Sequence, residues 1–154
     1  MSRAFVKESD QDPGALPERA VSPHPNLVTA RGLAALEARV RELEAGRRAA
    51  RTAHDAAALA AIARDLRYFQ ARRDSARLVT PAAAPDAVRF GVLVRLERID
   101  GTQLAYRIVG EDEADPAAGL ISYVSPLAKA ILGLTAGDDV AVAGASAVIL
   151  KIEG

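Results

Sequence analysis

A single carboxylate stands in the stretch of sequence that separates two helical patterns, and it is the first candidate for chemistry. Asp55 is the only acidic residue between Glu44 and Asp65, and His54 precedes it directly. Mg²⁺ is usually held by one or two carboxylates together with phosphate, so a lone aspartate is a weak metal candidate. Neighbouring helical residues point in different directions, which makes His54 and Asp55 poor co-ligands. We therefore expect Asp55 to be a structural acid facing the helix dipole. We expect the chain to contain no catalytic, metal-binding or cofactor-binding residue.

Arginines surround this segment and form a predicted basic face. Arg47, Arg48 and Arg51 precede Asp55, and Arg64 follows it. The guanidinium group is suited to recognising phosphate or carboxylate. Two interpretations stay open: contact with a nucleic acid or an acidic protein surface, and a solvated helix face that keeps an alanine-rich segment in solution.

A second group of acids lies further along the chain. Asp112, Glu113 and Asp115 precede Ser125 and Pro126. Ser is a favoured N-cap and Pro a favoured first helical residue, so Ser125-Pro126 predicts the start of a helix. The acids fit either an exposed loop or a docking surface.

The spacing of apolar residues predicts the helices that carry the arginines. Over residues 29–79 two series with alternating steps of three and four indicate the seam of a coiled coil. The phase breaks near residue 53, where Thr52 and Asp55 resemble a capping box that starts a second helix. We expect an antiparallel helical hairpin with Val40 near Leu66. The two series are Leu33, Leu36, Val40, Leu43, Arg47, Ala50 and Leu59, Ile62, Leu66, Phe69, Arg73, Ala76.

Prolines and alternating apolar residues delimit the other segments. Residues 1–28 are proline-rich and without periodicity, which predicts a disordered tail. Residues 80–87 predict a linker. Residues 88–154 predict a small antiparallel sheet, with strands near 88–99, 104–110, 120–124, 140–143 and 147–152 and one helix at 127–132. The fold class is therefore α+β.

Composition narrows the classes of function. The chain has no Cys, which excludes disulfides and thiolate zinc sites. No apolar run approaches the roughly 18 residues of a membrane helix, so we expect a cytoplasmic protein that does not contact membranes. The net charge of zero hides an asymmetry: residues 29–79 carry eleven Arg against six acids, and residues 86–154 carry six basic against ten acidic residues. Such asymmetry is typical of partners with different charge.

Several stretches resemble one known family. Tyr106–Gly110 followed by Asp112–Asp115, and Ile121–Gly133 with its Ser-Pro pair, resemble the C-terminal domain of GreA and GreB in order and spacing. Thr29–Leu33 resembles the entry into the coiled coil of that family.

The resemblance implies a fold, a partner and a mechanism. The C-terminal domain is expected to be FKBP-like and to dock on the rim of the secondary channel of bacterial RNA polymerase. The implied docking residues are Asp112, Glu113, Asp115, Ser125 and Pro126. In the family the coiled coil enters the channel, where two acidic residues at its tip help to hold a Mg²⁺ ion. The polymerase then cleaves the 3′ end of the transcript.

The sequence departs from the family at the tip. The acidic pair is absent, and each predicted helix has about 22 residues, roughly 33 Å. The family's helices are longer by about 9 residues, or on the order of 13 Å. We therefore expect a monomeric, non-enzymatic regulator that docks on the polymerase without efficient stimulation of cleavage, in possible contact with RNA or DNA of the elongation complex.

Other functions remain as alternatives. One is a cleavage factor of GreA/GreB type, and another is a non-cleaving regulator that competes for the channel, as in the short-hairpin relative Rnk. An FKBP-like prolyl isomerase is disfavoured because residues 88–154 hold only Phe90, Tyr106 and Tyr123 as aromatic residues. A protein-interaction module without a polymerase partner, dimerising through its coiled coil, completes the set.

Overall fold

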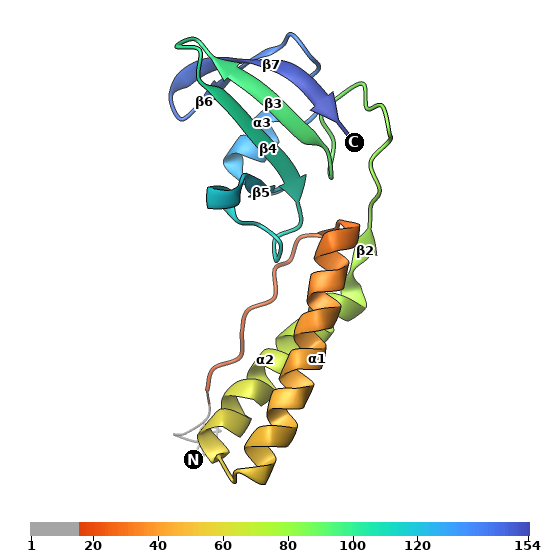
Figure 1. Cartoon of the computed structure of the whole chain (residues 1–154), viewed down its shortest axis with the longest axis vertical. Coiled ribbons are helices and arrows are strands. Elements are labelled where there is room, and N and C mark those ends of the chain that lie inside the picture. The colour runs from red at the N-terminus through yellow and green to blue at the C-terminus, as the bar shows by residue number, and fades with distance from the viewer. Residues whose placement is uncertain (1–15) are drawn as a thin grey trace, which may run out of the picture.

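The computed structural model describes residues 16–154 as a helical hairpin and a sheet domain placed end to end (Figure 1). Residues 1–15, the first half of the expected tail, lie outside the described residues. The N-terminal part of the described chain runs beside the hairpin, and the linker joins the hairpin base to the sheet (Figure 1). The architecture is α+β, as predicted.

The hairpin consists of α1 (Ala30–Thr52) and α2 (Ala56–Ser75). Its apolar cluster contains Val40, Leu43 and Leu66, with Ile62 and Phe69 packed against it. These residues belong to the predicted seam, and Val40 shares a cluster with Leu66 as expected. Helices of 23 and 20 residues agree with the short hairpin inferred from the sequence.

The turn at the tip differs in detail from the expected capping box. Thr52 still belongs to α1, where its hydroxyl donates to the Arg48 carbonyl at 3.1 Å. α1 ends in a Schellman motif: the Asp55 N–H donates to the Ala50 carbonyl at 3.0 Å, and His54 adopts a positive φ of 53°. The predicted start at Thr52 is therefore wrong, because that residue satisfies the end of the first helix.

The sheet contains five strands in the order β5-β4-β3-β7-β6 (Figure 1). Three of the four pairings are antiparallel, as predicted, and the pairing of β4 with β5 is parallel. The prediction of a purely antiparallel sheet is wrong here because residues 110–119 form a long connection, not a tight hairpin turn, and bring the chain back in the same direction. The elements are β3 (Leu93–Arg98), β4 (Gln103–Val109), the 3₁₀ helix η1 (Pro116–Ala118), β5 (Leu120–Ser122), α3 (Pro126–Ile131), β6 (Asp139–Val142) and β7 (Ala145–Glu153).

Helix α3 and the sheet enclose the main core. Alternation along β3 leaves Val94 and Leu96 without exposed surface, and Ile131 of α3 is equally buried. Burying side chains of this size stabilises the fold by about 1.5–3 kcal/mol each. The core comprises Val88, Phe90, Val92, Val94, Leu96, Ile108, Ile121, Ala128, Ile131, Val142, Ala147 and Ile149.

Part of the expected tail is ordered against the hairpin. β1 (Leu27–Val28) pairs in parallel with β2 (Arg77–Leu78), and Asn26 is only 6% exposed. The tail prediction is wrong for these residues, because the backbone of β2 and the base of α2 supply hydrogen bonds that local sequence does not reveal. Residues 16–26, here called the strap, extend these contacts along α2, where Glu18 pairs with Arg67. Residues 80–87 contain neither helix nor strand, in keeping with a linker.

Candidate functional site at the domain junction

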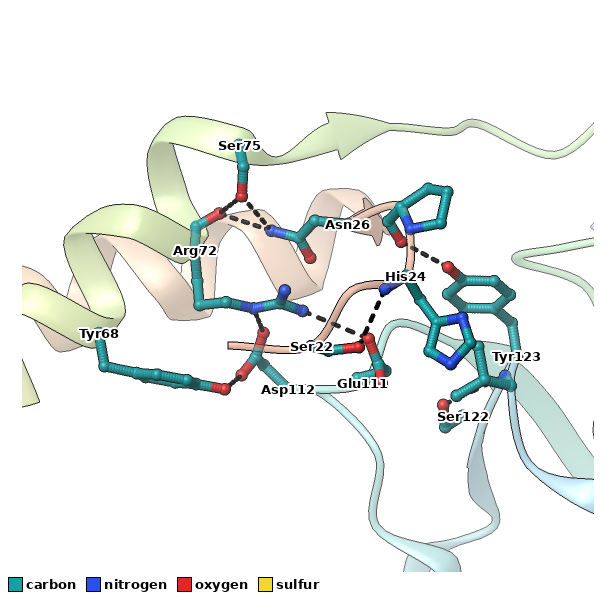
Figure 2. A network of polar contacts seen from close by, with 12 residues as sticks. Ser22, His24, Asn26, Tyr68, Arg72, Ser75, Glu111, Asp112, Ser122 and Tyr123 are labelled. Carbon is teal, nitrogen blue, oxygen red and sulfur yellow. Dashed lines mark hydrogen bonds and ion pairs between the residues drawn. The ribbon is translucent and has the colours of Figure 1, made fainter. Parts of the chain in front are cut away.

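The junction between hairpin and sheet domain is centred on a buried arginine. Arg72 lies in the last turn of α2, and its side chain is 2% exposed. Its Nε donates to Oδ2 of Asp112 at 2.5 Å, and its Nη2 lies 3.7 Å from Oε2 of Glu111 (Figure 2). Two carboxylates from the loop after β4 thus neutralise one guanidinium, which a buried charge requires.

Hydrogen bonds fix both partners of this ion pair. Tyr68, one turn before Arg72, donates its hydroxyl to the other Asp112 oxygen, Oδ1, at 2.6 Å (Figure 2). The Asn26 amide donates to the Arg72 carbonyl at 2.6 Å, which ties the strap to the end of α2. The Tyr123 hydroxyl donates to the Pro25 carbonyl at 2.5 Å, which ties the strap to the sheet domain.

A second contact joins the same loop to the start of α1. The Thr29 hydroxyl donates to Oε2 of Glu113 at 2.6 Å and accepts from the Gly32 N–H at 2.9 Å, so the N-cap of α1 also binds the sheet domain. The Glu113 side chain is 7% exposed, and Arg31 approaches it at 3.8 Å. Both helices of the hairpin therefore contact the acidic loop.

The five predicted docking residues do not form one exposed patch. The side chains of Asp112 and Glu113 turn toward the hairpin, whereas Asp115 is exposed. Ser125 accepts from the Ala128 N–H at 3.3 Å as the N-cap of α3, and Pro126 is exposed at the first helical position. The predicted capping role of Ser125 is confirmed.

Sequence reasoning missed the residues that bind these acids. Arg72, Tyr68 and Thr29 hold the loop, and their partners lie 40 or more residues away in the chain. The only local signal is the i, i+4 spacing of Tyr68 and Arg72, which places both side chains on one face of α2.

The tip presents the predicted arginines to solvent. Arg47, Arg48 and Arg51 are exposed, and none of the ion pairs found within residues 16–154 involves them. Arg64 pairs with its neighbour Asp65 at 3.3 Å. Asp55 accepts from the Ala58 N–H at 2.9 Å as the N-cap of α2, so its role is structural, as expected, but at the cap position and not in the first turn.

Within the described part of the chain, the structure contains neither a metal-ligand cluster nor a membrane-spanning helix. Among residues 16–154, no group of three or more His, Asp and Glu side chains is arranged to hold a metal ion. In the same range no helix is long and apolar enough to cross a membrane.

The pKa of Tyr68 reports whether the contact between the hairpin and the acidic loop is formed. Burial, and then the hydrogen bond to Asp112, raise the pKa of Tyr68 from 10.0 to about 12. A raised pKa stabilises the fold below pH 10, and this contribution is lost as the pH rises from 10 through 12. We expect the free energy of unfolding to fall more steeply over this interval in the native chain than in Tyr68→Phe, as measured by urea denaturation at several pH values. Equal slopes would contradict the assignment.

Comparison with known proteins assigns the sheet domain. Residues 82–153 match the sequence model described as "Transcription elongation factor, GreA/GreB, C-term". The transcription elongation factor GreA of Desulfovibrio desulfuricans is 50% identical over 58 residues, which cover 37% of this chain and 36% of the relative. GreA of Anaeromyxobacter sp. is 52% identical over 60 residues, covering 38% and 36%. The matched segment thus spans little more than a third of these relatives.

Solved structures share a lower sequence identity with this chain than the relatives named above. Gfh1 of Thermus thermophilus shares 21% identity over 85% of this chain and 100% of that chain, with a TM-score of 0.42. GreA/GreB from Nitrosomonas europaea shares 19% identity over 83% and 98%, with a TM-score of 0.41. The sequence match over residues 82–153, together with relatives that are about half identical over 58 to 60 residues, carries the assignment of this domain. The domain formed by residues 82–153 therefore belongs to the GreA/GreB C-terminal domain family.

Proposed function

We propose that the chain binds bacterial RNA polymerase at the rim of its secondary channel and does not efficiently stimulate transcript cleavage. The observation that carries the first half is the match of residues 82–153 to the C-terminal domain of the family, the part to which the resemblance assigns docking. The chain acts in this proposal as a cytoplasmic regulator that leaves all chemistry to the polymerase.

The tip of the hairpin supports the second half of the proposal. Holding a catalytic Mg²⁺ requires carboxylates whose oxygens reach the ion at about 2 Å. Asp55, the only carboxylate between Glu44 and Asp65, is engaged as an N-cap. α1 spans 23 residues, or about 34 Å, which is shorter than the resemblance implies for a cleavage factor.

The exposed arginines suggest what the tip does in place of cleavage. Arg47, Arg48 and Arg51 carry positive charge to the end of the hairpin, where guanidinium groups can bind phosphate or carboxylate. In this proposal they contact RNA, DNA or an acidic wall of the channel. Both helices come from one chain and bury their seam against each other, which favours a monomer.

Internal contacts of the predicted docking residues guide the choice of a test. Asp112 and Glu113 bind the hairpin, and the other three predicted residues are Asp115 and Pro126, which are exposed, and Ser125, which is half-buried. Among these, Asp115 provides the charge, and its exposed position allows substitution without loss of an internal contact.

Charge reversal at Asp115 tests the docking surface. Asp115→Arg is expected to weaken binding to core RNA polymerase by roughly tenfold, because a like charge replaces a complementary one at the rim of the contact. Fluorescence anisotropy of labelled protein titrated with core enzyme measures the affinity. The matched control, Asp139→Arg, changes an exposed aspartate on edge strand β6 and should leave the affinity unchanged. Equal affinities of all three proteins would remove Asp115 from the docking surface.

A further inference from the structure

The hairpin and the sheet domain have separate apolar cores. One cluster is built on the sheet and α3, and the other contains Val40, Leu43 and Leu66 of the hairpin. No residue belongs to both clusters within the described chain. Leu27 and Val79, which lie beside the hairpin base, are partly buried and pack against the sheet core. A shared apolar core therefore does not fix the direction in which the hairpin points.

Polar side chains restrict the orientation of the hairpin relative to the sheet domain, which the two separate apolar cores do not determine. The acidic loop 111–113 contacts α2 through Arg72 and Tyr68 and contacts α1 through Thr29. Hydrogen bonds are directional, so two contacts on different helices restrict rotation as well as separation.

We propose that Arg72 is a positioning residue, which fixes the direction of the hairpin relative to the sheet domain by binding Asp112 and Glu111. The planar guanidinium presents its donors in a rigid arrangement, which an ammonium group cannot reproduce. Tyr68 holds the second oxygen of Asp112, so both oxygens of this carboxylate are bonded from α2 (Figure 2).

The difference in exposure between Arg72 and its two acidic partners indicates that the contact orients the domains and is not needed for either domain to fold. Arg72 is 2% exposed, whereas the side chains of Asp112 and Glu111 are 15% and 23% exposed. If Arg72 is removed, the two carboxylates recover water when the loop moves away from α2. Both apolar clusters can stay buried during this movement, so the expected consequence is a mobile junction between two folded domains.

The consequence for transcription rests on the proposed function. A hairpin of this length can reach a defined point in a channel only if its direction is fixed by the domain that docks. Loss of Arg72 should therefore leave docking intact and impair whatever the basic tip does after docking.

Distance measurement between spin labels tests the orientation directly. The chain has no Cys, so cysteines placed at the exposed positions Ala49 of α1 and Ala130 of α3 are the only labelled sites. Double electron–electron resonance should give one narrow distance distribution for the doubly labelled native chain. In Arg72→Met the distribution should become at least about twofold broader or gain a second maximum, because the pair that restricts the loop is gone. Arg72→Lys should be intermediate, since it keeps the charge and loses the planar donors.

A control removes an arginine–carboxylate pair that lies within one domain. Arg95→Met breaks the exposed pair of Arg95 on β3 with Glu153 on β7, whose Nε–Oε2 distance is 2.6 Å, and should keep the narrow distribution. If Arg72→Met fails to fold, the double substitution Glu111→Gln with Asp112→Asn removes the two negative charges of the same contact while keeping side-chain size, and should broaden the distribution in its turn. A narrow, unshifted distribution in the folded junction variant would overturn the proposal. Polymerase affinity is measured separately, so a protein that does not bind polymerase refutes the proposed function and leaves the positioning result standing.

Discussion

Leu66→Ala is expected to unfold the hairpin while the sheet domain remains folded. Leu66 is 3% exposed and is one of three buried residues in the hairpin cluster. Truncating a buried leucine to alanine costs about 2–5 kcal/mol, because burial is lost and a cavity remains. A cluster of three residues has little else to compensate for that loss, whereas the twelve-residue core of the sheet domain is untouched.

Circular dichroism and amide NMR together measure this effect. The helical signal at 222 nm should melt early, while the dispersed amide resonances of the sheet domain persist. Leu78→Ala provides the control, because Leu78 is 53% exposed and its truncation should change the free energy of unfolding by about 0.5 kcal/mol or less. A loss of less than about 1 kcal/mol in Leu66→Ala, or a single transition for both domains, would contradict the separation of the two cores.

Gly110→Ala is expected to disrupt the contact between β1 and the acidic loop. Gly110 is buried, and a Cβ at this position would collide with the backbone carbonyl oxygen of Leu27. A backbone atom cannot rotate away as a side chain can, so the two segments must move apart at a cost of roughly 1–3 kcal/mol.

Hydrogen exchange locates the effect of this substitution. The amides of Arg77 and Val79, which donate to Asn26 and Val28 in the β1–β2 pair, should exchange faster in Gly110→Ala. Gly46→Ala is a control of opposite sign: a Cβ there meets only Ile62 at an ordinary 3.5 Å inside α1, and it should stabilise the hairpin by about 0.5–1 kcal/mol. Unchanged exchange at both amides in Gly110→Ala would show that β1 does not depend on this close approach.

Local patterns in the sequence predict the elements of this fold better than their arrangement. The three- and four-residue spacing of leucines predicts the hairpin, and the alternation of apolar residues around Val94 and Leu96 predicts β3, because both patterns follow from one buried face. The direction of β5 depends on the connection 110–119, whose path is set by contacts with distant residues. The parallel pairing therefore could not be read from the strands themselves.

The candidate site shows the same limit. The seam pattern placed Arg73 toward the partner helix and left Arg72 unassigned, whereas Arg72 is the buried residue. A buried arginine is stable only with its counter-charges, and Asp112 lies 40 positions away. The sequence predicts docking or an exposed loop for the acids at 112, 113 and 115, and in the structure Asp112 and Glu113 bind the hairpin. The absence of an acidic pair at the tip, in contrast, could be read directly from the sequence.

The most direct test of docking without cleavage is a competition in a stalled elongation complex. Core RNA polymerase carrying an end-labelled transcript is mixed with a cleavage-competent GreA, and this chain is added in increasing amounts. Occupation of the same rim predicts a dose-dependent loss of 3′ cleavage, with no cleavage above the polymerase background when this chain is present alone. Undiminished cleavage at saturating concentration, or robust cleavage by this chain alone, would contradict the account.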